Sequence, residues 1–179
     1  MARRETAARR YAEAAFEIGR GDGTLDRWEA DLSRLGELLT DPTLRRLVEH
    51  PGVAYADKEA VLRRIVGDAV AAEPLSLVLL MVRRGRPGAI GRMIDLFGEL
   101  LRRERGVALA EVRTALPLDE AQRAAVQTRL AALTAATIEM NEVVDESLIG
   151  GIAVRIGDVL YDASVRNRLE RLRARLTAS

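Results

Sequence analysis

The sequence predicts two domains of different class: a six-helix bundle over residues 1–105 and a small α/β domain with a mixed sheet over residues 106–179. Three observations lead to this prediction. Apolar residues recur at helical spacing through roughly the first hundred residues. The spacing changes to the alternation of a strand at Val107. A compact strand–turn–strand–helix pattern then runs from Ile149 to Leu172.

Composition favours a folded, helix-rich chain. Hydrophobic residues make up 48% and charged residues 31% of the sequence, which is typical of soluble proteins. The 28 basic and 27 acidic residues leave a charge of +1, which argues against a general nucleic-acid binder. There is no signal-peptide pattern and no run of about 20 apolar residues, so we expect an unexported chain that does not enter the membrane.

The residues needed for common catalytic chemistry are missing. The chain has no cysteine and a single histidine, His50, which stands at a predicted helix end without companions. The usual nucleophilic triads and metal centres therefore cannot be assembled. We expect no catalytic residue, no metal and no cofactor.

Each helix of the predicted bundle has a recognisable start. Asp41 and Pro42 are typical of a cap and the first helical residue. A glycine-rich loop at residues 19–23 is expected to end the first helix, and Trp28 is expected in or near the core. The expected starts are Ala7, Thr24 or Asp26, Asp41, Asp57, Glu73 and Ala89.

The first and fifth helices are more apolar than one core contact requires. Tyr11, Ala14, Ala15 and Ile18, with further alanines, cover about twice the arc of a single buried stripe. Alanine as a good helix former explains this pattern as well as contact with a second partner does. Residues 75–82 are apolar nearly all round, which indicates burial or a groove on more than one side.

The C-terminal domain is predicted from strands over residues 107–113 and 137–144, separated by a helix that starts near Asp119. A third strand, a Gly157-Asp158 turn and a short fourth strand follow. Asp162 is interpreted as the cap of the last helix. The apolar stripe of that helix is expected to be buried and consists of Val165, Leu169, Leu172 and Leu176. The residues that we interpret as structural geometry, not as ligands for phosphate or metal, are Gly150, Gly151, Gly157, Asp158, Asp162 and Ser164.

Charged clusters in this domain have two interpretations each. Glu139, Glu142, Asp145 and Glu146 form either a cation site or a solvated acidic rim, and we favour the rim because Glu139 and Glu142 fall on opposite faces of a strand. The arginines of the last helix either hold RNA or form its solvated face. We favour the solvated face, because no aromatic residues that stack on bases accompany Arg166, Arg168, Arg171, Arg173 and Arg175.

The C-terminal stretch resembles a known family. Residues 149–158 read IGGIAVRIGD and continue at 161–169 as YDASVRNRL, which resembles the C-terminal signature of the F-type ATP synthase delta subunit, or oligomycin-sensitivity-conferring protein. ARRYAEAAF at residues 8–16 looks like the first helix of that family, and MVRRGR at 81–86 resembles the end of its fifth. The resemblance covers the whole chain in order.

This resemblance implies a non-catalytic stator subunit, located peripherally at the cytoplasmic face of the cell membrane. The bundle would bind N-terminal helices of alpha subunits, one of them in a groove between helices one and five. The C-terminal domain would bind the C-terminal ends of the b subunits. The candidate groove residues by this carry-over are Tyr11, Ala14, Ala15, Ile18, Val78 and Val82.

The alternative function is an RNA-binding regulatory protein, because the predicted bundle resembles that of bacterial transcription antitermination factors. The near-neutral N-terminal segment and the second domain argue against this alternative. An enzyme is disfavoured by the missing residue types.

Overall fold

A computed structural model describes residues 2–177, with side chains for residues 5–174 and 176. The chain divides into two compact units, Met1–Leu101 and Arg102–Ser179. This division falls inside helix α6 (Ile90–Glu104), slightly before the boundary expected at residues 105–106. Each unit is described by itself.

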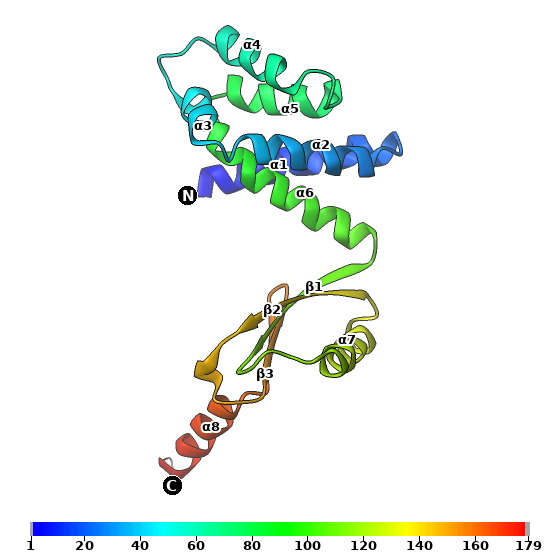
Figure 1. The fold of residues 1–179 in the computed structure, drawn as a ribbon, viewed down its shortest axis with the longest axis vertical. Coiled ribbons are helices and arrows are strands. Elements are labelled where there is room, and N and C mark those ends of the chain that lie inside the picture. Colours follow the sequence, from blue (N-terminus) through cyan, green and yellow to red (C-terminus); the bar gives the residue numbers. More distant parts are fainter. Residues whose placement is uncertain (1, 178–179) are drawn as a thin grey trace. The chain divides into compact units, whose positions relative to one another are not determined.

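The N-terminal unit is built from helices, as predicted (Figure 1). Asp41 caps α3 through hydrogen bonds that its carboxylate accepts from the backbone N–H groups of Thr43 and Leu44, at 2.9 and 2.8 Å. Pro42 is the first helical residue, where its missing N–H costs nothing. The elements are α1 (Ala2–Gly21), α2 (Leu25–Leu38), α3 (Pro42–Glu49), α4 (Tyr55–Val66), α5 (Ala72–Arg83), the 3-10 turn η1 (Pro87–Ala89) and α6.

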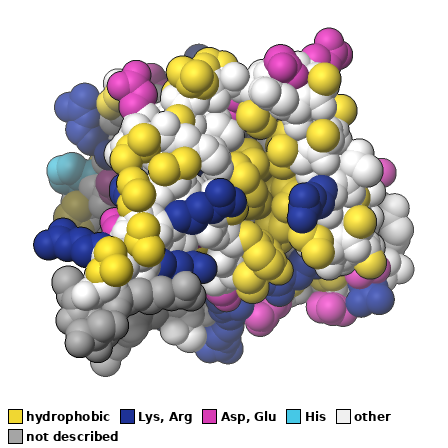
Figure 2. Space-filling view, turned by 90° about the horizontal axis from the view of Figure 1, so that it is seen from below, with side chains coloured by type: hydrophobic (Ala, Val, Ile, Leu, Met, Phe, Trp, Pro, Cys, Tyr) yellow, Lys and Arg dark blue, Asp and Glu magenta, His cyan; other side chains and the backbone are white. Residues whose placement is uncertain are grey.

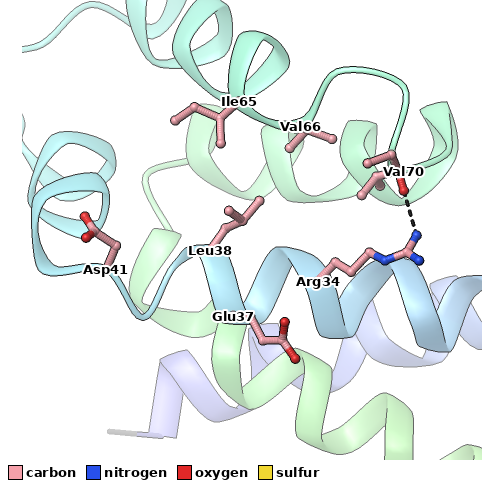
Figure 3. Close-up of a pocket in the computed structure, with 8 residues that line it drawn as sticks. Arg34, Glu37, Leu38, Asp41, Ile65, Val66 and Val70 are labelled. Atoms are coloured by element: carbon pink, nitrogen blue, oxygen red, sulfur yellow. Dashed lines mark hydrogen bonds between the residues drawn. The ribbon is translucent and has the colours of Figure 1, made fainter.

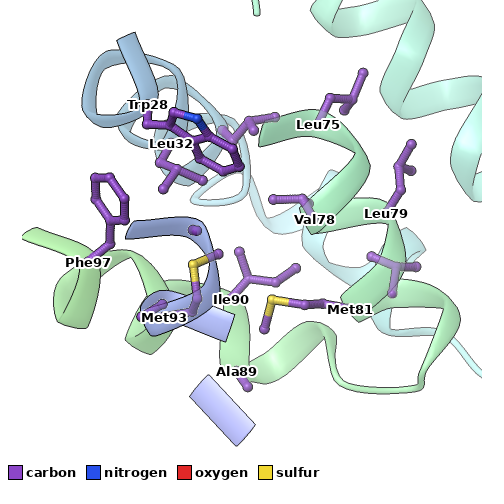
Figure 4. Packing of buried hydrophobic residues seen from close by; sticks show 14 of the residues in the cluster. Trp28, Leu32, Leu75, Val78, Leu79, Met81, Ala89, Ile90, Met93 and Phe97 are labelled. Atoms are coloured by element: carbon purple, nitrogen blue, oxygen red, sulfur yellow. The ribbon is translucent and has the colours of Figure 1, made fainter. Parts of the chain in front are cut away.

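An aromatic cluster lies in the core of this unit. The Phe97 ring of α6 packs edge-on against Phe16 of α1, with the ring centroids 6.2 Å apart. It stacks on Trp28 of α2 at 6.4 Å. Figure 4 shows Trp28 and Phe97 in one cluster with Val78 of α5 and Met93 of α6. The prediction that Trp28 belongs to the core is confirmed.

The first helix is longer than predicted. Gly19 continues α1 to Gly21, whereas a loop was expected to begin at Gly19. A Cβ atom at Gly19 would lie 2.9 Å from Cδ1 of Trp28, so glycine at this position permits close packing of α1 on α2. The chain turns only at Gly23, whose φ is +67°.

The C-terminal unit is a mixed sheet with helices, and the predicted fold class is confirmed. Within residues 2–177 the strand order is β2-β1-β3-β4, with β1 and β2 parallel and the remaining pairs antiparallel. Asp119 begins α7 through a capping box with Gln122. The elements are β1 (Val107–Thr114), α7 (Glu120–Thr134), β2 (Thr137–Val144), the 3-10 turn η2 (Glu146–Leu148), β3 (Ile152–Ile156), β4 (Val159–Asp162) and α8 (Val165–Thr177).

One face of the sheet packs against α7. Alternation along β1 directs Ala110 and Val112 to this face, where they meet Ile138 of β2 and Val154 of β3. Leu130 of α7 covers them. The main core cluster of this unit therefore lies between one helix and one sheet face, while Leu148 of η2 is buried outside that cluster.

The buried Thr114 at the end of β1 provides a test of this core. Its side chain is 3% exposed, and its hydroxyl has no hydrogen-bond partner among the described residues. Thr114→Val is expected to raise the free energy of unfolding of the C-terminal unit by about 1 kcal/mol, because it removes an unpaired buried hydroxyl and keeps a β-branched side chain. Urea unfolding followed by circular dichroism measures this. Thr137→Val, at an exposed position of β2, is the control, and a loss of stability in Thr114→Val would contradict the explanation.

The start of α8 differs from the prediction that Asp162 caps it. The hydroxyl of Ser164 accepts the hydrogen bond from the backbone N–H of Asn167 at 3.1 Å, so Ser164 is the cap. Asp162 is the last residue of β4, and its carboxylate accepts the backbone N–H of Ser164 at 2.9 Å. Asp162 thus orients the capping residue and does not cap the helix itself.

The expectation of a buried stripe on α8 is wrong. Leu169, Leu172 and Leu176 are 52%, 53% and 72% exposed, and Val165 is half-buried. The helix packs on η2, while α7 covers the core face of the sheet, so most of the stripe has no partner within the described chain. The side chain of Arg175 lies outside the described residues.

Candidate partner-binding surfaces

Helices α1 and α5 lie against each other within the bundle, as a shared groove requires. The six candidate residues fall into two groups. Tyr11 is half-buried, and Ala14 and Ile18 are exposed on α1. Ala15, Val78 and Val82 are buried in the core cluster, and Figure 4 shows Val78 among the core side chains. These three residues can fix the positions of the two helices from within the core, but they are too buried to contact a partner directly.

The accessible apolar residues of α5 are different from those selected in the sequence. Leu80 is 40% exposed and Leu77 is half-buried, and Ile18 of α1 is 48% exposed. The apolar character of α5 all round therefore has two origins: most positions fill the core, and Leu77 and Leu80 remain at the surface. We use the name α1–α5 surface for the accessible apolar residues of these two adjacent helices, which are Tyr11, Ala14, Ile18, Leu77 and Leu80.

A pocket of about 440 Å³ lies between α2 and the end of α4 (Figure 3). Leu38, Ile65 and Val66 supply apolar side chains. Two of the three charged side chains around it are already engaged: Arg34 donates a hydrogen bond to the carbonyl of Ala69 at 2.8 Å, and Asp41 caps α3. This arrangement stabilises the bundle and does not resemble a catalytic site.

The C-terminal unit exposes a second apolar surface. We define the β4–α8 surface as the exposed apolar side chains of these two elements. Its members are Val159, Leu160, Tyr161, Leu169, Leu172 and Leu176, each 48% exposed or more. Exposed hydrophobic side chains lie among basic ones in Figure 2. Side chains alternate along β4, so Val159 and Tyr161 lie on one face of the sheet and Leu160 on the other. The exposed stripe of Leu169, Leu172 and Leu176 on α8 is the feature that favours an interaction site.

The acidic residues of this unit form local contacts of the fold. Glu142 accepts the backbone N–H of Leu118 at 2.7 Å and pairs with Arg123 at 2.8 Å. These two contacts, the first more strongly, hold the pKa of Glu142 below its usual range. Hydrogen bonds from the hydroxyl and N–H of Ser147 likewise lower the pKa of Asp145. Glu139 is exposed, as expected for a rim.

The lowered pKa of Glu142 predicts acid sensitivity of the C-terminal unit. The pKa of Glu142 is lower in the folded chain than in the unfolded chain, where it is near 4.5, so below that pH the unfolded chain binds more protons. The stabilisation is complete above about pH 4.5 and is lost as the pH falls through the folded-state pKa. Glu142→Gln, which keeps an acceptor for Leu118, should show a smaller loss of stability between neutral pH and about pH 3. Urea midpoints across this range test the prediction, and equal losses in both proteins would contradict it.

Other potential sites are not assembled in the described structure. No group of three or more histidine or acidic residues able to hold a metal ion occurs among the described residues. His50 follows α3, and its Nδ1 accepts the backbone N–H of Gly52 at 3.1 Å. In the part of the chain that the structure describes, no helix combines the length and hydropathy of a membrane span.

Comparison with known proteins decides the family. The model of the ATP synthase delta (OSCP) subunit family matches residues 7–176. The chain belongs to this family. Relatives named ATP synthase subunit delta include one from Caulobacter vibrioides, 39% identical with 93% of this chain and 92% of that protein covered. Another, from Anaeromyxobacter, is 33% identical with coverages of 94% and 96%.

A solved structure agrees with this membership of the delta (OSCP) family. The chain is similar to one chain in the mitochondrial ATP synthase hexamer of Toxoplasma gondii, with a TM-score of 0.75 and 25% identity. The match covers 96% of this chain and 98% of that chain. The resemblance based on the C-terminal signature is confirmed.

Two buried charged residues of this delta-family chain were missed in the sequence. Asp31 is 3% exposed, and its carboxylate accepts the backbone N–H of Ala71 at 2.9 Å. Lys58 is 9% exposed and lines a second pocket. Helical periodicity places Asp31 on the same face as Trp28 and Leu35, which is the one signal that indicated its burial.

Proposed function

We propose that this chain is the stator subunit that links the catalytic head of an F-type ATP synthase to its peripheral stalk. In this role it holds the head against the torque of the rotating central stalk. The observation that supports this proposal most directly is the presence of an accessible apolar surface on each of two units in a member of the delta (OSCP) family. A linker needs two such surfaces, one for each partner.

In this proposal the α1–α5 surface binds an N-terminal helix of an alpha subunit. An amphipathic helix that docks in a groove contributes apolar residues at helical spacing. Ile18 and Leu80 would contact that helix, while the buried Ala15, Val78 and Val82 would fix the positions of α1 and α5 from within the core.

The β4–α8 surface would bind the C-terminal ends of the b subunits. Leu169, Leu172 and Leu176 recur at helical spacing along α8, so they form one stripe for a partner helix. The arginines beside this stripe would add charge contacts at its margin, where such contacts affect the rate of association more than the affinity. The chain would then lie peripherally at the cytoplasmic face of the membrane, held there by its partners.

The binding test uses the full chain and three ligands: a peptide from the N-terminal end of an alpha subunit, a peptide from the C-terminal end of a b subunit, and a structured RNA. Ile18→Asp with Leu80→Asp should weaken binding of the alpha peptide about tenfold or more and leave the b peptide unaffected. Leu169→Ser with Leu172→Ser should have the opposite selectivity. Each double variant is therefore the control for the other in calorimetric titrations. Salt-sensitive RNA binding without a response to either peptide would overturn the proposal in favour of an RNA-binding regulator.

We also expect the purified chain to hydrolyse no ATP, because its role is mechanical. A coupled assay across gel-filtration fractions measures this. Turnover that follows the protein peak, and that changes in a variant of the chain, would contradict a non-catalytic role.

A further inference from the structure

A second pocket, of about 750 Å³, lies where the end of α3, the start of α4 and the α5–α6 connection meet. Apolar residues such as Val48 and Val82 form part of its wall. The charged residues that line it are Lys58, Arg83, Arg86 and Glu49. Three cations therefore face one anion, although the chain as a whole is nearly neutral.

Lys58 is the unusual member of this group. It is 9% exposed, yet its ammonium forms no hydrogen bond and no ion pair with the described residues. The ammonium is not among the fully enclosed polar atoms, so the aliphatic stem of Lys58 is buried while its charged end stays accessible and unpaired. Arg83 lies over the ring of Tyr55, 5.7 Å from its centroid, and adds positive charge close to the pocket.

Glu49 does not neutralise the group. Its side chain is exposed at the end of α3, and the described residues show no ion pair between it and Lys58. The pocket thus combines a largely buried lysine whose accessible ammonium is unpaired, two arginines and enough volume for a small anion. An oxyanion in the pocket would supply the missing partner through charge-assisted hydrogen bonds.

We infer that this pocket binds an oxyanion, either a phosphate group or a carboxylate, with Lys58 as its central contact. The residues that line the pocket include none of those that define the α1–α5 and β4–α8 surfaces, and the inference does not depend on the proposed function. The ligand is free phosphate or the acidic side chain of a partner, and the two sources are distinguished by probes.

The sequence allows a direct test, because Lys58 is the only lysine in the chain. Full-length protein labelled with ¹³C and ¹⁵N in lysine gives one side-chain signal by NMR. The probes are inorganic phosphate and N-acetylglutamate amide, each compared with sodium chloride at equal ionic strength in a buffer without phosphate. A saturable shift of the Lys58 signal is expected with an oxyanion and not with chloride. A shift with phosphate alone assigns the site to phosphate groups, and a shift with both extends it to carboxylates. No saturable shift with either probe would overturn the inference.

Arginine variants separate a built pocket from general attraction to a basic surface. Arg86→Gln, in the pocket wall, should weaken binding about fivefold. The matched control is Arg64→Gln, which removes an exposed arginine from α4 outside the pocket and should leave binding unchanged. Equal weakening by the two variants would contradict a specific site.

Discussion

Replacement of Gly151 by alanine is expected to destabilise the C-terminal unit by about 3 kcal/mol. The φ of Gly151 is +78°, which disfavours any residue with a Cβ. A Cβ at this position would also lie 2.7 Å from the carbonyl oxygen of Ala163 and 3.1 Å from Cα of Ser164. The backbone cannot move aside easily, because the N–H of Ala163 donates to the carbonyl of Ile152 and that of Val165 to the carbonyl of Gly150, both at 2.9 Å.

Gly157→Ala is the matched control for this prediction. Gly157 also has a positive φ, of +57°, but a Cβ at this position would have nothing within 4 Å. It should therefore show the conformational cost alone, about 1 kcal/mol. Urea unfolding by circular dichroism measures both variants. The fluorescence of Trp28, the only tryptophan, reports on the other unit and should not change. Equal losses in the two glycine variants would show that the close approach to Ala163 has no energetic consequence.

Removal of the Asp31 carboxylate is expected to destabilise the bundle by about 2–3 kcal/mol. Asp31→Ala leaves the buried N–H of Ala71 without its acceptor at the start of α5. It also leaves Arg27 and Arg34, whose nitrogens lie 3.8 and 3.6 Å from the carboxylate, without their nearest opposite charge. The loss should appear in the unfolding transition followed by Trp28 fluorescence.

The effect of Asp31 is separable into hydrogen bonding and charge. Asp31→Asn keeps an oxygen acceptor for Ala71 and removes the negative charge, so its loss of stability should be clearly smaller. Equal losses of stability in Asp31→Ala and Asp31→Asn would contradict this expectation. They would show that the negative charge near Arg27 and Arg34 accounts for most of the stabilisation and that the hydrogen bond to Ala71 contributes little.

Much of the fold was predictable because its signals are local. Pro42 after a capping aspartate and the change of period at Val107 each depend on neighbours in the sequence. The errors depended on distant contacts. The glycine-rich sequence predicts a helix end at Gly19, but the role of Gly19 is set by its close approach to Trp28 on the next helix. Likewise, Asp162 belongs to the end of β4, so the residue that caps α8 is Ser164 and not Asp162.

The sequence indicates that the first and fifth helices are rich in apolar residues, but it does not indicate which of these residues are accessible. An α5 segment that is apolar nearly all round contains no information on which side faces the core. Packing buries Val78 and Val82 and leaves Leu80 accessible. The same limit applies to α8. Helical periodicity identifies an apolar stripe that includes Leu169 and Leu172, but it does not show whether another part of the chain covers that stripe.

The short edge strand β4 has a consequence for copies of the chain that have not yet been assembled. Its apolar side chains, about half exposed, lie at an open sheet edge, where two chains can pair and aggregate. The strand is only four residues long, with Asp158 immediately before it and Asp162 at its end. Short length and flanking charge both hinder the growth of intermolecular sheets. If β4 and α8 bind the stalk as proposed, the chain keeps an apolar sheet edge accessible for that partner and still resists self-association before it is bound.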